Sequence, residues 1–191
     1  YLLGREVETV DNLPDIVITF ESLKKAKNEK EVLRILKGNR SVTWEMIPTE
    51  YHKSKKVWRQ LFENGMPQTA LIRNATRFAR LGLFNDMVFA AQYSTALMDE
   101  NKIERGRIHP IQYLSASVVF KDGQIQRDEY GYLWNVRRNK DWESNAQVQS
   151  ALNKGYELAF KNLIPAGKRT LLGLDVSGSM ASPCSGLELS C

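Results

Sequence analysis

The chain has 191 residues, of which 42% are hydrophobic and 26% charged, a composition typical of a soluble globular protein. Its 12 glycines and 6 prolines are too few for a low-complexity chain, and no stretch approaches the roughly 18 apolar residues that cross a bilayer. The net charge of +5 is compatible with nucleic-acid binding, although many ordinary cytoplasmic proteins share it. Cys184 and Cys191 can form neither a disulfide framework nor a four-ligand zinc site, which indicates a reducing cytoplasm.

Start and stop signals predict a succession of helices over residues 24–37, 54–64, 67–81, 85–98, 110–122 and 143–163. Gly38 ends the first of these, Ser54 can cap the second, and Asn85 is expected to cap the fourth. The fifth begins at Pro110, and three of its apolar residues share one side: Ile111, Leu114 and Val118. Helices of this length with short turns suggest an α-solenoid of the HEAT type, although the sequence contains no self-similar motif.

The segment 122–141 is polar and aromatic, and it is interpreted as a loop or an irregular insertion. The pattern then changes after Gly167, where the short apolar run 170–175 predicts a fully buried parallel strand. A buried helix segment would look similar, but the small, flexible residues 177–179 favour a strand that ends in a loop. Such a strand needs neighbours. We therefore expect a piece of a longer protein, with helical repeats over 1–166 and the start of an α/β domain over 167–191.

Three oxygen-bearing residues follow the predicted strand: Asp175, Ser177 and Ser179. Ligands of open α/β sheets lie beyond the carboxyl ends of strands, and hard oxygen ligands suit Mg²⁺ or another divalent cation. The Asp-x-Ser-x-Ser pattern matches the metal-ion-dependent adhesion site of von Willebrand A-like domains. A serine-rich loop that caps a helix is the alternative. Three ligands would hold Mg²⁺ weakly, so the predicted site is incomplete.

Three arginines, Arg73, Arg77 and Arg80, recur at i, i+4 and i+7, opposite the apolar face of the predicted 67–81 helix. Arginines in such a row can contact a phosphate backbone, although a solvated helix face has the same appearance. Secondary candidates are Arg107 and His109, at a helix start, and Lys53, in a basic turn. No nucleophile with an activating base, phosphate loop or dinucleotide-binding glycine pattern is visible. The sequence therefore does not indicate an enzyme.

Several segments in matching order, from about residue 40 to 180, together resemble the Ro autoantigen (TROVE-domain) family, with a form closer to bacterial or phage members. They are Tyr51-His52-Lys53-Ser54-Lys55-Lys56-Val57-Trp58, Met66-Pro67-Gln68-Thr69-Ala70-Leu71-Ile72-Arg73-Asn74, Arg107-Ile108-His109-Pro110, and the run from Gly167 to Met180. The resemblance implies HEAT-like helices closed by a von Willebrand A-like domain.

It further implies a cytoplasmic ribonucleoprotein that binds small non-coding Y RNAs and misfolded RNA ends, and that tethers an exoribonuclease, without a membrane or DNA partner. The family's earlier helices and nearly all of the A-like domain have no counterpart here. The alternative is a protein-interaction scaffold that uses a metal-dependent adhesion site and binds no RNA. Steep salt dependence would favour RNA, whereas sensitivity to a chelator alone would favour the scaffold.

Overall fold

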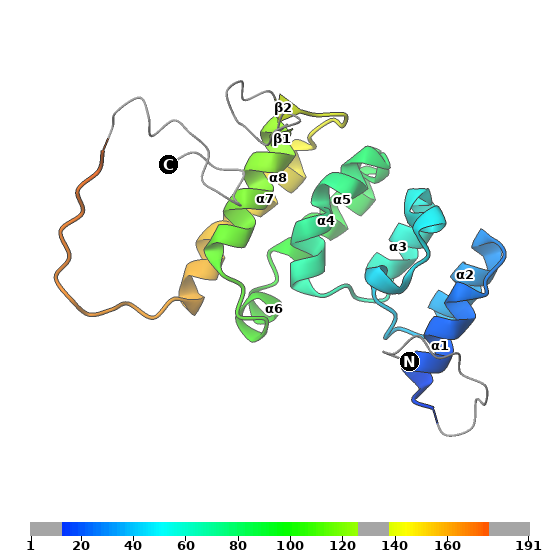
Figure 1. Cartoon of the computed structure of the whole chain (residues 1–191). Coiled ribbons are helices and arrows are strands. Elements are labelled where there is room, and N and C mark those ends of the chain that lie inside the picture. The colour runs from blue at the N-terminus through cyan, green and yellow to red at the C-terminus, as the bar shows by residue number, and fades with distance from the viewer. Residues whose placement is uncertain (1–12, 126–137, 176–191) are drawn as a thin grey trace, which may run out of the picture. The chain divides into compact units, whose positions relative to one another are not determined.

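The computed structural model describes residues 13–125 and 138–175, and it is mainly helical, as the sequence predicts (Figure 1). It divides into two compact units, residues 1–66 and 67–191. This division differs from the predicted boundary after residue 166. That boundary separates helical repeats from the start of an α/β domain, and it stays a prediction. Within the described ranges, no helix combines the length and the apolar character that crossing a membrane requires.

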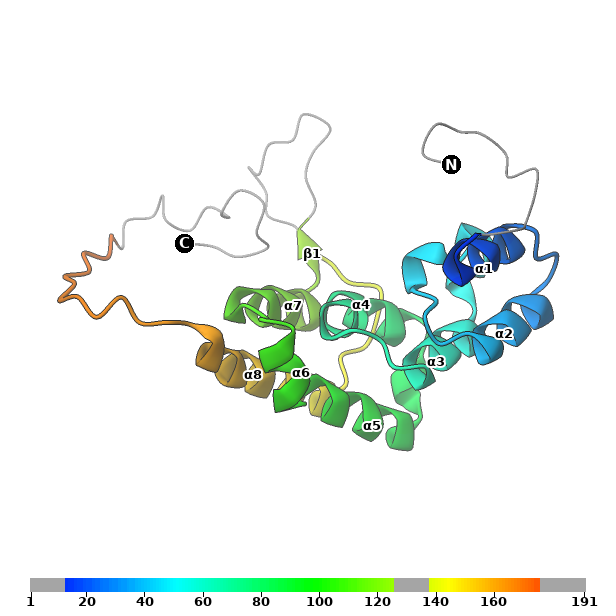
Figure 2. The same cartoon turned by 90° about the horizontal axis from the view of Figure 1, so that it is seen from below.

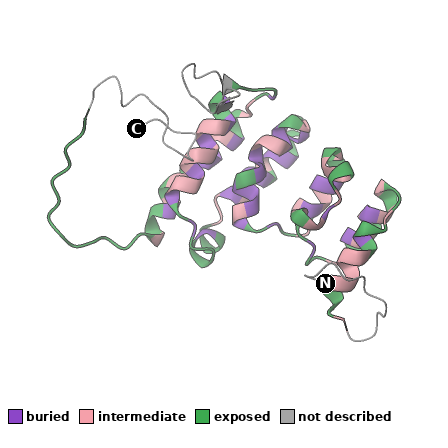
Figure 3. Ribbon diagram, in the orientation of Figure 1, coloured by how far each residue is buried: buried purple, intermediate pink, exposed green. Residues whose placement is uncertain are grey.

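From residue 13 on, the described part of the first unit contains three α-helices and two short 3-10 turns: α1 (Asp15–Lys24), α2 (Glu29–Gly38), η1 (Trp44–Met46), η2 (Thr49–Lys53) and α3 (Lys55–Glu63). Helix α2 packs on both α1 and α3. Its core is formed by side chains that are at most 3% exposed: Leu23, Val32, Leu36, Val57, Trp58 and Leu61. Figure 3 shows buried and exposed positions along the helices of this unit.

The helix predicted over 24–37 starts too early, because α2 begins only at Glu29 after a break at residues 25–28, and Lys24 is the last residue of α1, which the sequence analysis does not predict. Asn28 is the physical reason, because its side chain accepts a hydrogen bond from the Glu31 N–H at 3.0 Å and so begins α2. The Glu31 carboxylate reaches back to accept from the Lys27 N–H at 2.8 Å. The prediction for α3 is confirmed, since Ser54 caps it through the Val57 N–H at 3.2 Å.

The second unit contains α4 (Gln68–Arg80), η3 (Leu83–Asn85), α5 (Met87–Leu97), α6 (Glu100–Arg105), α7 (Pro110–Asp122), α8 (Ala146–Ala159) and η4 (Phe160–Asn162). Helix α7 packs against α4 and α8, and α5 packs against α8; Figure 2 shows this arrangement. The helices α4 and α7 begin roughly 40 residues apart, the usual length of a HEAT unit.

Aromatic side chains from four elements fill the centre of this unit. The Phe78 ring of α4 lies 4.8 Å from the Tyr93 ring of α5, centroid to centroid, and Phe84 lies 6.1 Å from Phe120 of α7. The Tyr93 hydroxyl donates to the Leu71 carbonyl at 2.5 Å, which satisfies its polar group inside the core. This core fixes which face of α4 points inward.

One detail of the predicted helices is wrong, and another takes its meaning from the packing. The cap of α5 is Asp86 rather than Asn85, because the Asp86 carboxylate accepts from the N–H groups of Val88 and Phe89 at 3.0 and 3.1 Å. A charged carboxylate at this end also interacts favourably with the helix dipole. In α7 the grouped apolar residues are only half-buried, and the core face is instead formed by Tyr113, Ser117 and Phe120.

The segment interpreted as an insertion begins and ends in a short antiparallel pair, β1 (Gln124–Ile125) and β2 (Arg138–Asn139). The buried strand expected over residues 170–175 is not formed. These residues have no regular structure, and Leu171 and Leu174 are 97% and 84% exposed. The physical reason is that a strand satisfies its backbone only by pairing, and no described residue pairs with this segment.

Candidate nucleic-acid interface

The arginine row of α4 is oriented by the helix's apolar face. Leu71, Ala75 and Phe78 are at most 1% exposed, as the spacing predicts. The opposite face therefore carries Arg73, Arg77 and Arg80, of which Arg77 is half-buried and the other two are exposed. With a rise of about 1.5 Å per residue, the row extends about 10 Å along the helix. We call these three residues the α4 row.

Arg80 is held by two residues that lie about sixty positions later in the chain. Its Nε donates to Oδ1 of Asp141 at 2.6 Å, and its guanidinium lies over the Trp142 ring, 4.6 Å from the centroid. The hydrogen bond from Arg80 lowers the pKa of the Asp141 carboxyl. The sequence places no acid within the row, so this partner could not be predicted from the helix alone. Arg80 is therefore pre-positioned but also partly neutralised.

Arg77 lies between its two neighbours and is less accessible than they are. Burial, and then the positive charge of Arg80, lower the pKa of the Arg77 guanidinium. An arginine nevertheless stays protonated near neutral pH. The mutual repulsion shows that the row concentrates positive charge, which an anion such as a phosphate would relieve.

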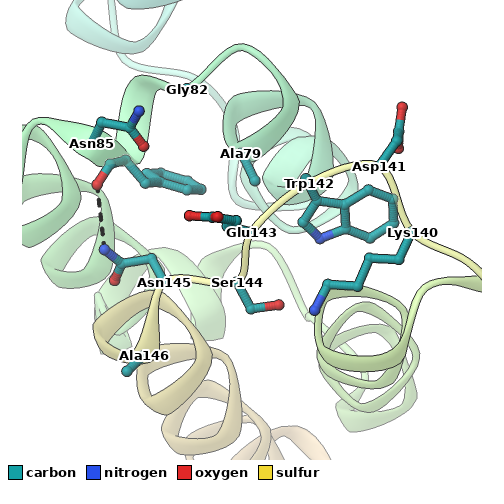
Figure 4. A pocket seen from close by; sticks show the side chains of 11 residues that line it. Ala79, Gly82, Asn85, Lys140, Asp141, Trp142, Glu143, Ser144, Asn145 and Ala146 are labelled. Atoms are coloured by element: carbon teal, nitrogen blue, oxygen red, sulfur yellow. Dashed lines mark hydrogen bonds between the residues drawn. The ribbon is translucent and has the colours of Figure 1, made fainter.

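Trp142 also forms one wall of an open pocket of about 670 Å³ at the C-terminal end of α4 (Figure 4). Most of its polar side chains hold the fold: Lys140 donates to the Lys121 carbonyl at 2.7 Å, and Ser144 donates to the Phe120 carbonyl at 2.6 Å. Asp141 and Glu143, two acids in the lining, outnumber the single cation Lys140. The pocket therefore does not favour a phosphate, and the phosphate-binding candidates remain on the outer face of α4.

The secondary candidates lie elsewhere. Arg107 and His109 come together in the turn between α6 and α7, whereas Lys53 is an exposed residue at the end of η2 in the first unit. His109 is the cap of α7, and its Nδ1 accepts from the Ile111 N–H at 3.2 Å. The cap gives this histidine a structural role at the start of α7.

Arg107 takes a left-handed backbone conformation, with φ of 47°. The Ile108 N–H donates to the Ile103 carbonyl and the Arg107 N–H to the Glu104 carbonyl, which is the hydrogen-bond pattern of a glycine-type helix end. An exposed arginine at such a position is unusual, because most side chains disfavour that conformation. Its side chain is nevertheless accessible to a ligand.

Of the predicted metal ligands, only Asp175 is among the described residues, where it is exposed; Ser177 and Ser179 lie outside them. In the described parts of the chain, no group of three or more acidic, histidine or cysteine side chains could hold a metal ion. One exposed carboxylate does not make a site. The metal site stays a prediction.

A second row of cations was missed in the sequence. Lys30, Arg34 and Lys37 on α2 have the same i, i+4, i+7 spacing as the α4 row, and all three are exposed. The signal was present in the sequence, but the predicted helix over 24–37 contained further lysines that obscured the face. The cap at Asn28 fixes the start of α2 and so separates this row from them. We call it the α2 row.

Comparison with known proteins identifies relatives over most of the chain. The TROVE domain matches residues 21–132. The RNA-binding protein RO60 of Caenorhabditis elegans is 36% identical over 177 residues, 93% of this chain and 26% of its own length. The RNA-binding protein RO60 of Deinococcus radiodurans is 35% identical over 138 residues, 71% of this chain and 24% of its own length.

The crystal structure of the Deinococcus radiodurans Ro (Rsr) protein superimposes with a TM-score of 0.74 at 29% identity. The match covers 93% of this chain and 34% of that one. This likeness confirms the predicted helical solenoid for the described helices. The chain spans about a quarter of the length of the curated relatives it matches.

Proposed function

This chain belongs to the TROVE domain family of Ro proteins, and on that premise we propose that it binds RNA through the α4 row. The observation that carries the proposal is the outward face of α4, where Arg73, Arg77 and Arg80 lie opposite a fully buried core face. Two relatives of the chain are named RNA-binding proteins.

The arginines of the α4 row are suited to phosphate contacts. Guanidinium groups donate planar pairs of hydrogen bonds that fit phosphate oxygens. The roughly 10 Å length of the row corresponds to about three phosphates at about 3.4 Å of axial spacing per strand. Arg80 is already held against Trp142 at 4.6 Å, so ordering it on RNA costs less side-chain entropy than ordering a mobile arginine.

We extend the proposal to the partner and the setting. The RNA would be a small structured non-coding RNA of the Y type or the end of a misfolded RNA, bound in RNA quality control in the cytoplasm. An exoribonuclease would act on the bound RNA, since we assign this chain no catalytic residue of its own. Arg107, His109 and Lys53 would add contacts outside the α4 row. The family resemblance supports these points.

The rival from a different class is a protein-interaction scaffold in which Asp175, Ser177 and Ser179 hold a divalent cation. No feature of the described residues favours it. Binding of a protein partner that is lost with a chelator and insensitive to salt would support this rival instead of RNA binding.

The test replaces Arg73, Arg77 and Arg80 together with glutamine and measures the affinity for a labelled structured RNA at several salt concentrations. Each lost phosphate contact reduces the salt slope by about 0.7 for single strands, so we expect a reduction of about 2. The matched control replaces three lysines that already form exposed ion pairs in the second unit, and it removes the same charge: Lys102, Lys154 and Lys161.

The control variant should keep most of the affinity. Because Arg80→Gln also removes the contacts with Asp141 and Trp142, a double variant Arg73→Gln/Arg77→Gln tests the row with those contacts intact. Helix content, followed by circular dichroism, should not change in any variant. Equal affinities for the α4 variants and the control would contradict the proposal.

A further inference from the structure

The α2 row is a group of three exposed cations on one helix face. Lys30, Arg34 and Lys37 are all exposed, whereas Val32 and Leu36, about half a turn away, are 0% exposed. The buried face therefore fixes the direction of the row, because a helix that anchors one side presents the opposite side to solvent. At about 1.5 Å per residue the row is about 10 Å long.

None of these three cations forms an ion pair within the described ranges. The two acids of α2 are engaged elsewhere: Glu29 lies 3.6 Å from the Lys56 ammonium, and Glu31 accepts from the Lys27 N–H and from the Asn28 side chain. The side chains of Lys30, Arg34 and Lys37 have no hydrogen-bond or ion-pair partner among the described residues. Like charges three and four positions apart destabilise a helix, so a polyanion on this face would relieve a cost that the free protein bears.

We propose that the α2 row is a second RNA contact, which binds the phosphodiester backbone independently of the base sequence. The inference rests on the proposed RNA binding and adds a separate surface in the first unit. The class of ligand follows from the chemistry. Two ammonium groups and a guanidinium carry positive charge and only hydrogen-bond donors, which suits them to phosphate oxygens, and phosphate contacts carry no base sequence information.

The α2 row differs from the α4 row in accessibility. In the α4 row, Arg77 is half-buried and Arg80 already contacts Asp141 at 2.6 Å. In the α2 row all three cations are exposed to solvent. Exposed, uncompensated charge contributes most to the diffusional capture of a polyanion. We therefore expect the α2 row to contribute mainly to the association rate and to salt-dependent affinity.

The experiment compares the 191-residue chain with the variant Lys30→Gln/Arg34→Gln/Lys37→Gln and with the control Lys102→Gln/Lys154→Gln/Lys161→Gln. Each variant loses three positive charges, so a non-specific effect of net charge would be equal in both. Glutamine has nearly the helix propensity of lysine and arginine, so α2 should remain folded. The readouts are the dissociation constant and the association rate for a labelled structured RNA. Both are measured between about 50 and 200 mM salt, where counterion release makes the affinity strongly salt-dependent.

We expect the α2 variant to lose affinity roughly tenfold at low salt, with a salt slope smaller by about 2, and the control to lose much less. Equal losses in the two variants would overturn the inference while leaving RNA binding by the chain intact. If the unaltered chain binds no RNA at any salt concentration, the proposed function itself fails. Binding to anionic lipid vesicles that depends on the row, with unchanged RNA affinity, would also overturn the inference.

Discussion

The side chain of Arg80 belongs both to the fold and to the candidate interface, because it contacts Asp141 and Trp142. Arg80 is 38% exposed and donates to Asp141, which is 61% exposed, while its guanidinium covers the buried Trp142 ring. An exposed ion pair contributes little to stability, but here it competes with any phosphate for the same arginine. Asp141 therefore limits the charge that the α4 row can offer to RNA.

Replacing Asp141 with asparagine should increase RNA affinity. The change removes the competing charge, while the Trp142 ring still supports the guanidinium, so we expect a gain of about two- to fivefold at low salt. The gain should disappear at high salt, where electrostatic contributions are screened. The control Glu63→Gln removes an exposed acid of the first unit and alters net charge equally. A lower affinity for Asp141→Asn would mean that the carboxylate is needed to orient Arg80.

Gly155 of α8 is required by the close approach of α7. A Cβ atom at this position would lie 2.2 Å from the ring of Tyr113, which is 0% exposed and cannot move aside. Alanine normally favours a helix by about 1 kcal/mol over glycine. We nevertheless expect Gly155→Ala to lower the free energy of unfolding by about 1–3 kcal/mol, because overpacking outweighs propensity. Denaturant unfolding measures this directly, and a more stable variant would contradict the packing.

At the scale of elements, the sequence pattern could not decide whether Asn85 or Asp86 caps α5. Asp86 accepts two backbone hydrogen bonds, whereas Asn85, the predicted cap, ends the preceding 3-10 turn. Asp86→Ala should reduce the free energy of unfolding by about 1–2 kcal/mol, and Asn85→Ala by much less. Similar effects of the two substitutions on the denaturation midpoint would show that the cap contributes little.

The helices with strong boundary signals could be predicted, and those without them could not. Ser54 and Gly123 lie at the ends of α3 and α7 as expected. Helix α6 has only six residues, too few for a periodic pattern, and it was missed. In α7 apolar residues occur on more than one side. The buried side is the one where the Tyr113 hydroxyl reaches Gln68 at 2.7 Å, a partner from another helix.

The candidate interface was also predictable only in part. The α4 row follows from spacing alone, because its cations lie opposite a regular apolar face. Its contact with Asp141 depends on how α4 packs beside the segment before α8, which no local pattern encodes. The α2 row had a local signal, but it emerges only once Asn28 fixes the start of the helix.

At the scale of the whole molecule, two buried tyrosines couple the second unit's stability to alkaline pH. Burial raises the pKa of Tyr113 to about 12, and burial also raises that of Tyr93 well above its ordinary value of 10.0. The folded state thus favours the neutral phenol. The stability that this contributes is complete below pH 10 and is lost as the pH rises toward 12.

We therefore expect the denaturation midpoint to fall progressively between pH 10 and about 12. The loss should be shallower in Tyr113→Phe, which cannot ionise at that position. Unfolding followed by circular dichroism at a series of pH values gives both slopes. Identical slopes in the two proteins would show that Tyr113 does not carry the dependence.

The segment 170–175 shows what a local pattern cannot decide. Its apolar run predicts a buried strand, yet Leu171, Leu172 and Leu174 are at least 79% exposed. Strand formation depends on partners distant in the sequence, and none is among the described residues. Helices satisfy their own backbone, which is why the helical solenoid was predictable and this strand was not.

The central claim, that this chain binds RNA through rows of cations on its helices, is tested most directly by one salt titration. A labelled structured RNA with a single-stranded 3′ tail is titrated with the unaltered chain across a range of salt concentrations. Six phosphate contacts from the α4 and α2 rows predict that the logarithm of the association constant falls linearly with that of the salt concentration, with a slope of about −4. Absence of binding at low salt, or an affinity that salt does not change, would contradict the claim.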